Sequence, residues 1–456
     1  MADRVVHIPA VFLPVLFLLC VILSGCGIIG TAVDKNLNSV ANTESGAPFA
    51  DFKKKHGDAF VADLHADTLL WPREMFPLKG PEANKGYDTG HVDYPRLING
   101  GVDLQMLTVV TKYPLTTTSI EDNPIYDPDA INLVGLLSVA QMWPPATWFD
   151  LNERALYQAG RLRKSVNAAN GQLVMIETAQ ELINFHKDNQ KHPDGIAVML
   201  GIEGAHALEI GIPPEGPIDE TAKLIIHDRV DEMFDAGFRM ISPTHHFDNE
   251  FGRSNTGLHG VPDDGIVDDG LTNLGHEAIL YMMQKGILID LAHASNNTIS
   301  DVLKLAKKIR QRVVVSHTGV QGVCKTNRNL SDGQIVDIAK AGGVIGIIYW
   351  DKLQWCPTGG GEATAAQILD GIVRSMEYVM NSIADYKVGS DAIPGAPSQY
   401  VALGSDFDGA VRTPFDTAGV WRIRAALEES GMNLSASDID NIMGGNVLRL
   451  LIETLP

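Results

Sequence analysis

The stretch that decides the fold is Val61-Ala-Asp-Leu-His-Ala-Asp-Thr-Leu69, in which a short apolar run ends in His65 and Asp67. Four further runs end in the same way, and they place Glu203 in AVMLGIEGAH, His293 in GILIDLAHAS, His317 in VVVSHTG and Asp406 in VALGSDFDG. Short, mostly apolar runs are typical of parallel strands that are buried on both faces. Polar residues at the ends of several such strands indicate the rim of a (β/α)8 barrel.

Eight strands of this kind can be traced along the body of the chain. They cover residues 60–64, 102–110, 196–202, 239–244, 287–292, 313–316, 344–349 and 401–404. Apolar residues at helical spacing lie between most of them, as in Ser300–Ile309. This alternation predicts an α/β fold of the TIM barrel type. We expect insertions after strand 2 and in residues 376–399 before strand 8.

The amino terminus is expected to be a targeting segment. Arg4 precedes an apolar stretch over residues 11–23, and Leu23-Ser-Gly-Cys26 resembles the lipobox of bacterial lipoproteins. We therefore expect a signal peptide over residues 1–25 and a lipid on Cys26; an uncleaved signal anchor is the alternative. Residues 26–50 are predicted to form a flexible tether and residues 51–456 the barrel domain. The expected location is the bacterial cell envelope, and Gly27 rather than Asp after the cysteine favours the outer membrane.

Composition narrows the function classes. The chain has 456 residues and a formal net charge of −20, which argues against binding to nucleic acid. Of its four cysteines, Cys20 lies in the predicted signal and Cys26 at the lipid site. Cys324 and Cys356 remain in the barrel, where they could pair in an oxidising compartment or stay as separate buried thiols.

The strand-end residues predict a metal centre. His65 and Asp67 are two residues apart on a strand, so their side chains point to the same face and can reach one ion. Imidazole and carboxylate are ligands that suit zinc. Glu203, from the third strand, could bridge two ions. Two zinc ions about 3.5–4 Å apart would hold a hydroxide between them and polarise a carbonyl, which indicates a metal-dependent hydrolase.

Taken together, the motifs resemble the membrane dipeptidase family of zinc peptidases, of the renal dipeptidase type. They are DLHADT, GIEGAHAL, SPTHHFDN, GILIDLAHAS, VVVSHTG, KTNRN, GSDFDG and GGNVLRLL, spread over residues 60–451. The resemblance implies hydrolysis of dipeptides, with tolerance of a D-residue at the second position. It also implies two zinc ions, one held by His65, Asp67 and Glu203 and the other by Glu203, His293 and His317.

The same resemblance assigns the remaining site residues. His245 would contact the substrate carbonyl, Arg328 would bind the substrate carboxylate and Asp406 would act as the acid and base. It also favours a disulfide between Cys324 and Cys356. A guanidinium suits a carboxylate because it can bind both oxygens in a fork. His246 is expected to point away from His245, because neighbouring residues on a strand face opposite ways.

Two other functions remain open at this stage. One is a different binuclear amidohydrolase that acts on a cyclic amide, lactam or ester. Many such enzymes have a carboxylated lysine on strand 4, and FRMISPTHH over residues 238–246 contains no lysine. The other is a non-catalytic lipoprotein that binds peptides, which would be expected to have lost ligands. Small dipeptides and the membrane are the expected partners, and a homodimer is left open.

Overall fold

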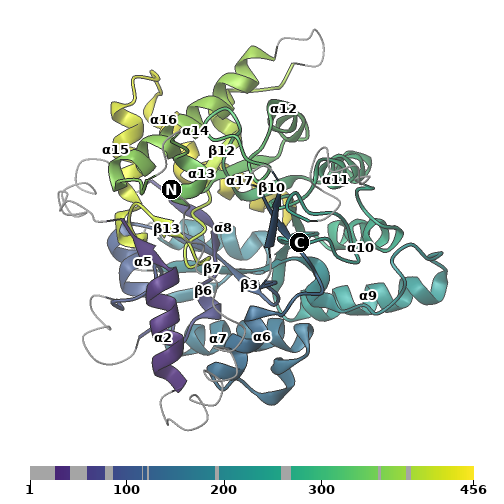
Figure 1. The fold of residues 1–456 in the computed structure, drawn as a ribbon. Helices are drawn as coiled ribbons and strands as arrows, with labels where there is room; N and C mark the ends of the chain where they lie inside the picture. The colour runs from purple at the N-terminus through teal and green to yellow at the C-terminus, as the bar shows by residue number, and fades with distance from the viewer. Residues whose placement is uncertain are drawn as a thin grey trace.

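The computed structural model describes residues 26–41, 59–77, 86–115, 117–120, 123–189, 195–257, 269–357, 361–386 and 392–456. Within them, eight parallel strands close into a barrel in the order β3-β2-β12-β11-β10-β9-β8-β7, and β7 pairs back to β3 (Figure 1). The strands are β2 (Ala62–Ala66), β3 (Leu104–Val110), β7 (Ile196–Glu203), β8 (Phe238–Ile241), β9 (Leu288–Asp290), β10 (Val313–Thr318), β11 (Val344–Ile347) and β12 (Val401–Leu403). The predicted TIM barrel is confirmed, with all eight of its strands.

The barrel strands have no face exposed to solvent, which explains their mostly apolar sequence pattern. Every residue of β2, β3 and β7 is buried, because one face lines the barrel interior and the other packs against helices. Strand packing is close at Gly404, directly after β12. A Cβ atom there would lie 1.9 Å from the backbone oxygen of Ser316, so only glycine fits.

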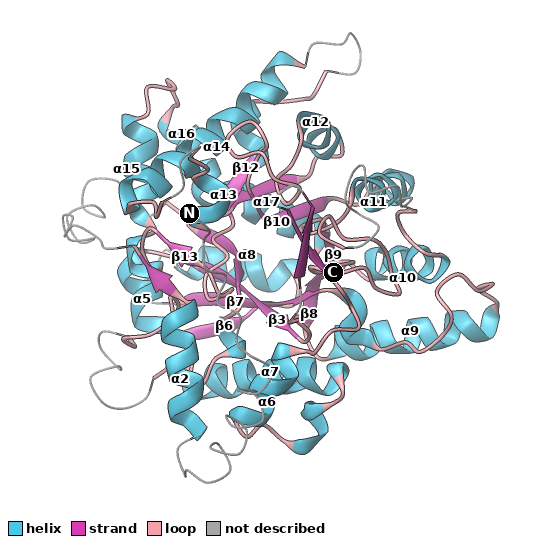
Figure 2. Ribbon diagram, viewed as in Figure 1, coloured by secondary structure: helices cyan, strands magenta, loops and turns pink. Residues whose placement is uncertain are grey.

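Helices surround the barrel on the outside, as Figure 2 shows. They are α5 (Tyr94–Gly100), α6 (Leu133–Ala140), α7 (Leu151–Ala168), α8 (Ala179–Asn189), α9 (Glu220–Asp235), α10 (Asn273–Gln284), α11 (Asn296–Ile309), α12 (Asp332–Lys340), α13 (Asp351–Gln354), α14 (Ala365–Asp385), α15 (Trp421–Glu429), α16 (Ala436–Asp440) and α17 (Asn446–Thr454). Several start at a side chain that accepts a hydrogen bond from the first turn, such as Asp150 before α7, Asp219 before α9 and Ser295 before α11.

The insertion after the second barrel strand has its own elements. It contains a hairpin of β4 (Thr117–Ile120) and β5 (Asn123–Tyr126), the helices α6, α7 and α8, and a short strand β6 (Leu173–Met175). Strand β6 pairs with the first half of β7 and adds a ninth strand to the sheet. This strand is not predicted from the sequence, because three residues are too few to show a periodicity. Before β12, residues 376–385 complete α14, and Pro397–Tyr400 forms a 3-10 helix.

The prediction of a flexible tether over residues 26–50 is wrong for residues 26–41. Cys26–Leu37 forms helix α2, and Ser39–Val40 forms strand β1, which pairs with β13 (Arg412–Thr413). Helix α2 contacts α6 of the insertion. Contacts with distant residues, which composition does not report, stabilise this segment. The rest of the tether, residues 42–50, and the signal peptide predicted over residues 1–25 lie outside the described residues.

Two further observations complete the fold. Cys324 and Cys356 form the disulfide that the family resemblance favoured, with Cα atoms 5.5 Å apart. Among the described residues, no helix is both long and apolar enough to span a bilayer.

Candidate metal centre

The predicted metal ligands and Asp406 lie together at the carboxyl end of the barrel. All six are buried, with at most 7% of any residue exposed. His65 lies within β2, His317 lies within β10, and Glu203 is the last residue of β7. The other three follow the end of a strand: Asp67 comes just after β2, His293 just after β9 and Asp406 just after β12. Because the barrel is closed, residues from opposite parts of the sheet meet over its centre.

Glu203 lies between two groups of ligand atoms. Its Oε1 atom is 3.1 Å from Nε2 of His293 and 3.4 Å from Nε2 of His317. The same oxygen is 3.7 Å from Nε2 of His65. One carboxylate oxygen therefore faces the ligands expected for both ions.

The second group is built around His65. Its Nε2 atom lies 3.5 Å from Oδ1 of Asp67 and 3.9 Å from Oδ1 of Asp406. The ligand atoms of His65, Asp67 and Asp406 all lie within 4.8 Å of one another, and so do those of Glu203, His293 and His317. Nitrogen and carboxylate oxygen atoms at this spacing are the donor set of a zinc site, so the residues present fit a metal centre.

The charges of the site favour a bound cation. Burial raises the pKa of Glu203 well above its ordinary value, and repulsion from Asp67 adds to this. Burial alone would lower the pKa of His65, yet the three carboxylates around it raise that pKa to about 10. His293 and His317 have their pKa values held well below the ordinary value, mainly by burial. Neutral imidazoles beside converging carboxylates form a place where positive charge is stabilised.

Three residues outside the predicted site, one on each of β3, β9 and β10, contact the predicted ligands or their supports. The Ser316 hydroxyl donates a hydrogen bond to Oδ2 of Asp290 at 2.6 Å, and it lies 3.1 Å from Nδ1 of His65 and 2.8 Å from Nδ1 of His317. Thr108 donates to Oδ1 of Asp67 at 2.6 Å. Contacts of this kind turn the Nε2 atoms toward the centre. Ser316 and Asp290 lie inside quoted motifs, but only the folded barrel shows which ligands they touch.

The residues predicted to bind substrate border the same centre. Nε2 of His245 lies 3.0 Å from Oε2 of Glu203. Arg328 has a guanidinium nitrogen 3.0 Å from Nε2 of His293, and the same nitrogen donates to the backbone oxygen of His317. Arg328 is 7% exposed, so its charge lies within the site rather than at the surface.

The expectation for His246 is wrong. Its ring centre lies 4.3 Å from that of His245 and 4.5 Å from that of His293, so it faces the centre. Strand β8 ends at Ile241, and the chain then turns, so the alternation of a strand does not apply at residues 245 and 246. Tyr126, at the end of the β4–β5 hairpin, packs its ring 4.6 Å from the His246 ring and brings the insertion to the site.

The loop that carries Arg328 is held from two directions. The Cys324–Cys356 disulfide ties it to the segment after α13. The Asn329 amide donates to the backbone oxygen of Cys324 at 2.7 Å and of Leu353 at 3.3 Å. This support lowers the entropy that Arg328 would lose on binding a ligand.

The backbone is strained at two of the site residues. His293 has φ 64° and Asp406 has φ 62°, which is the left-handed region that residues other than glycine rarely adopt. Such conformations cost energy and persist where surrounding contacts impose them, commonly at functional sites.

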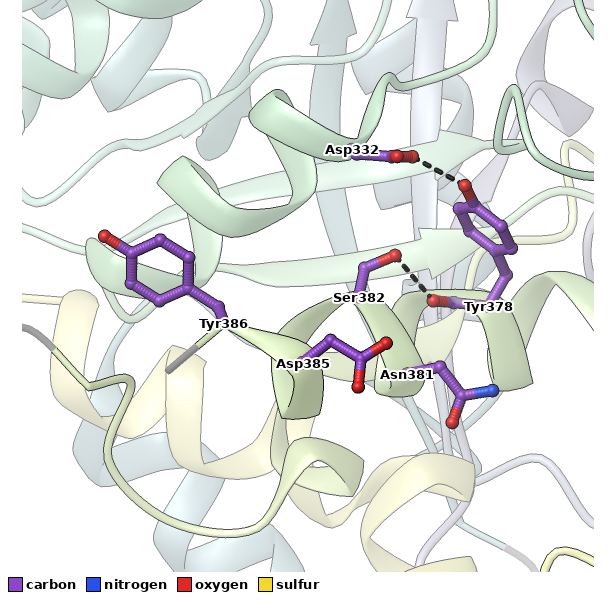
Figure 3. A pocket seen from close by; sticks show the side chains of 6 residues that line it. All are labelled: Asp332, Tyr378, Asn381, Ser382, Asp385 and Tyr386. Carbon is purple, nitrogen blue, oxygen red and sulfur yellow. Dashed lines mark hydrogen bonds between the residues drawn. The ribbon is translucent and has the colours of Figure 1, made fainter. Parts of the chain in front are cut away.

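A separate hollow lies on the outer surface between α12 and α14 (Figure 3). Its volume is about 350 Å³, and it is lined by Asp332, Tyr378, Asn381, Ser382, Asp385 and Tyr386. The Tyr378 hydroxyl donates to Asp332, so part of its polar surface is already used within the hollow. None of the predicted site residues borders it, and we do not assign the chemistry to this hollow.

Comparison with known proteins identifies the family. The sequence profile described as membrane dipeptidase, peptidase family M19, matches residues 51–455. The chain belongs to this family. A dipeptidase of Aspergillus oryzae is 24% identical over 86% of this chain and 77% of that protein. An uncharacterized dipeptidase of Schizosaccharomyces pombe is 27% identical over 66% of this chain, and the match spans 62% of the yeast protein.

Solved structures agree on the fold. A metallopeptidase from Rhodobacter sphaeroides, liganded with a phosphinate mimic of the dipeptide L-Ala-D-Ala, is 20% identical with a TM-score of 0.61. A dipeptidase described as a metallopeptidase of family M19 is 21% identical with a TM-score of 0.63. Each comparison covers 87% of this chain and 99% of the other. The barrel of this chain is therefore the fold of the family.

Proposed function

We propose that this protein hydrolyses dipeptides at a centre of two zinc ions. The observation that carries the proposal is the position of Glu203 Oε1, within 3.1–3.7 Å of His293, His317 and His65. His65, Asp67 and Glu203 would hold one ion, and Glu203, His293 and His317 the other. When bound, the two ions would polarise the scissile carbonyl and lower the pKa of the attacking water.

The chain's own residues would bind the substrate and move protons. Asp406 would accept a proton from the attacking water and pass it to the leaving amine. Its position beside His65 places it within reach of the first group of ligands. His245 would stabilise the negative charge that develops on the carbonyl oxygen. Arg328 would hold the free carboxylate of the dipeptide, which fixes the distance from that carboxylate to the scissile bond.

A D-residue at the second position is part of the proposal. Its support is the relative from Rhodobacter sphaeroides, which was solved with a mimic of L-Ala-D-Ala. Parallel assays of L-Ala-D-Ala and L-Ala-L-Ala test this directly. Cleavage of the L,L substrate alone would remove stereochemical tolerance from the proposal and leave dipeptide hydrolysis intact.

The role of Arg328 can be tested with substrates. Free dipeptides should be cleaved, whereas dipeptide amides and tripeptides should be poor substrates, because the carboxylate would be absent or displaced by one residue. The change Arg328→Met removes a charge-assisted interaction worth about 1.5–3 kcal/mol, so kcat/KM for a free dipeptide should fall about ten- to a hundredfold. Arg374→Met, at an exposed arginine on α14, is the matched control. An equal loss for dipeptides and their amides would show that Arg328 does not bind the carboxylate.

Metal content is the second test. Purified protein should contain about two equivalents of zinc, and a chelator should abolish hydrolysis until zinc is restored. Full activity in protein that holds no metal would refute the proposed centre.

We also propose that the protein is a lipoprotein of the bacterial envelope, anchored through Cys26 and facing the periplasm from the outer membrane. Its support is the Leu23-Ser-Gly-Cys26 sequence after an apolar stretch. A labelled fatty acid should be incorporated into the wild type and not into Cys26→Ser. Absence of label from the wild type would refute the anchor, while fractionation of labelled protein would test the choice of membrane.

A further inference from the structure

The segment before the barrel inserts a charged side chain into the folded body. Asp34, on α2, has no exposed surface. Its carboxylate accepts a hydrogen bond of 2.6 Å from Nε of Arg73 and one of 2.9 Å from the Asn38 amide. An unpaired buried charge strongly opposes folding, so the burial of Asp34 depends on these partners in the folded body.

Arg73 links Asp34 to the loop that carries Asp406. The guanidinium that binds Asp34 also lies 2.8 Å from Oδ1 of Asp408, two residues after Asp406. His91 forms a second bridge. Its Nδ1 atom accepts a hydrogen bond from the backbone N–H of Asp408. Its Nε2 atom therefore carries the proton and donates to the backbone oxygen of Ser39, which lies 3.2 Å from Nε2.

The amino-terminal segment also binds the backbone of this loop directly. The Asn38 side-chain oxygen accepts from the backbone N–H of Ala410 at 2.9 Å. Strand β1 then pairs with β13, where Ser39 lies beside Arg412. The segment therefore contacts the loop at its middle and at its end.

The loop needs such support because it is strained at alternate positions. Asp406, Asp408 and Ala410 have φ values of 62°, 64° and 61°, and none of them is glycine. The left-handed conformation is unfavourable for residues other than glycine, so a free loop of this sequence would leave it. Contacts from Arg73, His91 and Asn38 fall on the second and third of these residues.

We propose that the segment Cys26–Ala41 is a brace for the loop Asp406–Thr413, and that Asp34 is a positioning residue for Asp406. The role assigned to Asp406 rests on the dipeptidase function proposed above. The brace itself rests on the contacts of Asp34, Asn38 and Ser39. Asp34 touches neither the proposed ligands nor Arg328, so its effect on catalysis would pass through the loop.

The test compares Asp34→Asn with wild type in the full chain. Asparagine keeps the shape of the side chain and removes the charge that holds Arg73. Hydrogen–deuterium exchange of the peptide covering residues 403–413 should become at least severalfold faster. On a dipeptide, kcat should fall about tenfold, because a small misplacement of a catalytic group is costly, while KM and zinc content stay within about twofold. Asp370→Asn, at an exposed aspartate of an ion pair on α14, is the control and should change none of these.

A second variant guards against loss of folding. Asn38→Ala removes a single side chain from the brace and should change exchange and kcat in the same direction by a smaller amount. Unchanged exchange in both variants would overturn the brace, even if thermal stability fell. Faster exchange with an unchanged kcat in both would overturn the positioning role of Asp34. If wild-type protein cleaves no peptide, the proposed function fails, and the exchange measurement still decides whether the brace exists.

Discussion

Acid should destabilise this protein in part through His206, a buried histidine outside the proposed ligand set. His206 is 3% exposed, its ring packs 4.8 Å from that of Phe247, and neither ring nitrogen has a hydrogen-bond partner among the described residues. Burial lowers the pKa of His206 to about 3, and the positive charges of Lys112 and Arg154 add to the effect.

The direction and size of the effect follow from linkage. The folded state holds His206 neutral down to about pH 3, whereas the unfolded chain binds a proton near pH 6.5. Stability from the neutral ring is therefore complete above pH 6.5 and is lost as the pH falls toward 3. Between pH 7.5 and pH 5.0 this one group should remove about 2 kcal/mol from the free energy of unfolding.

The perturbation is His206→Leu, which keeps an apolar side chain of similar volume. Urea unfolding of wild type and variant is followed by circular dichroism at pH 7.5 and 5.0, with zinc at a fixed excess. The variant should lose about 2 kcal/mol less than the wild type between the two pH values, whatever its stability at pH 7.5. His276→Leu is the control at a partly exposed histidine. It shows whether the effect comes from the burial of His206 or from the loss of any imidazole. Equal losses in wild type and His206→Leu would refute the reasoning.

Two other predictions concern the metal centre and the disulfide. Glu203→Gln should bind less than half of the wild-type zinc, because the carboxylate that lies between the two groups of predicted ligands loses its charge. Atomic emission measures the zinc content, and two retained equivalents would contradict a bridging role. The double change Cys324→Ser and Cys356→Ser opens a link between residues 32 apart and should lower the free energy of unfolding by about 3–4 kcal/mol in the chain-entropy account. Wild type in reductant should match this variant in thermal unfolding, and an unchanged melting temperature in both would contradict it.

The sequence was sufficient to predict the barrel and to predict that the candidate ligands lie close together in it. Each strand is buried on both faces, so its sequence is a mostly apolar run. Such a run can be recognised without an alternation of polar and apolar residues. His65, Glu203 and His317 could be assigned to one centre because parallel strands in a closed barrel all end on the same rim. At these strands, the local sequence pattern and the topology of the closed barrel predict the same arrangement.

The errors occur where long-range contacts decide the conformation. Residues 26–41 have the composition of a linker, and their helix and strand depend on Arg73 and β13, which are distant in sequence. The prediction for His246 is wrong because the sequence does not show that β8 ends at Ile241. The apolar and hydroxyl residues of the run continue to Thr244, so the prediction extends the alternation of a strand to His246. Ser316 and Asp290 could not be recognised as supports, because their partners come from other strands.

The docked helix α2 would also determine how an anchored form of this protein moves. A flexible linker over residues 27–50 would have a root-mean-square end-to-end distance of about 25–30 Å, and the barrel could move away from its lipid by about that distance. Helix α2 instead spans Cys26–Leu37 and is about 18 Å long, so in an anchored form a docked helix would replace the first half of the flexible linker and shorten the free reach of the barrel. The enzyme would then diffuse in two dimensions, and its encounter rate would depend on peptide concentration in the thin layer of solvent next to the membrane.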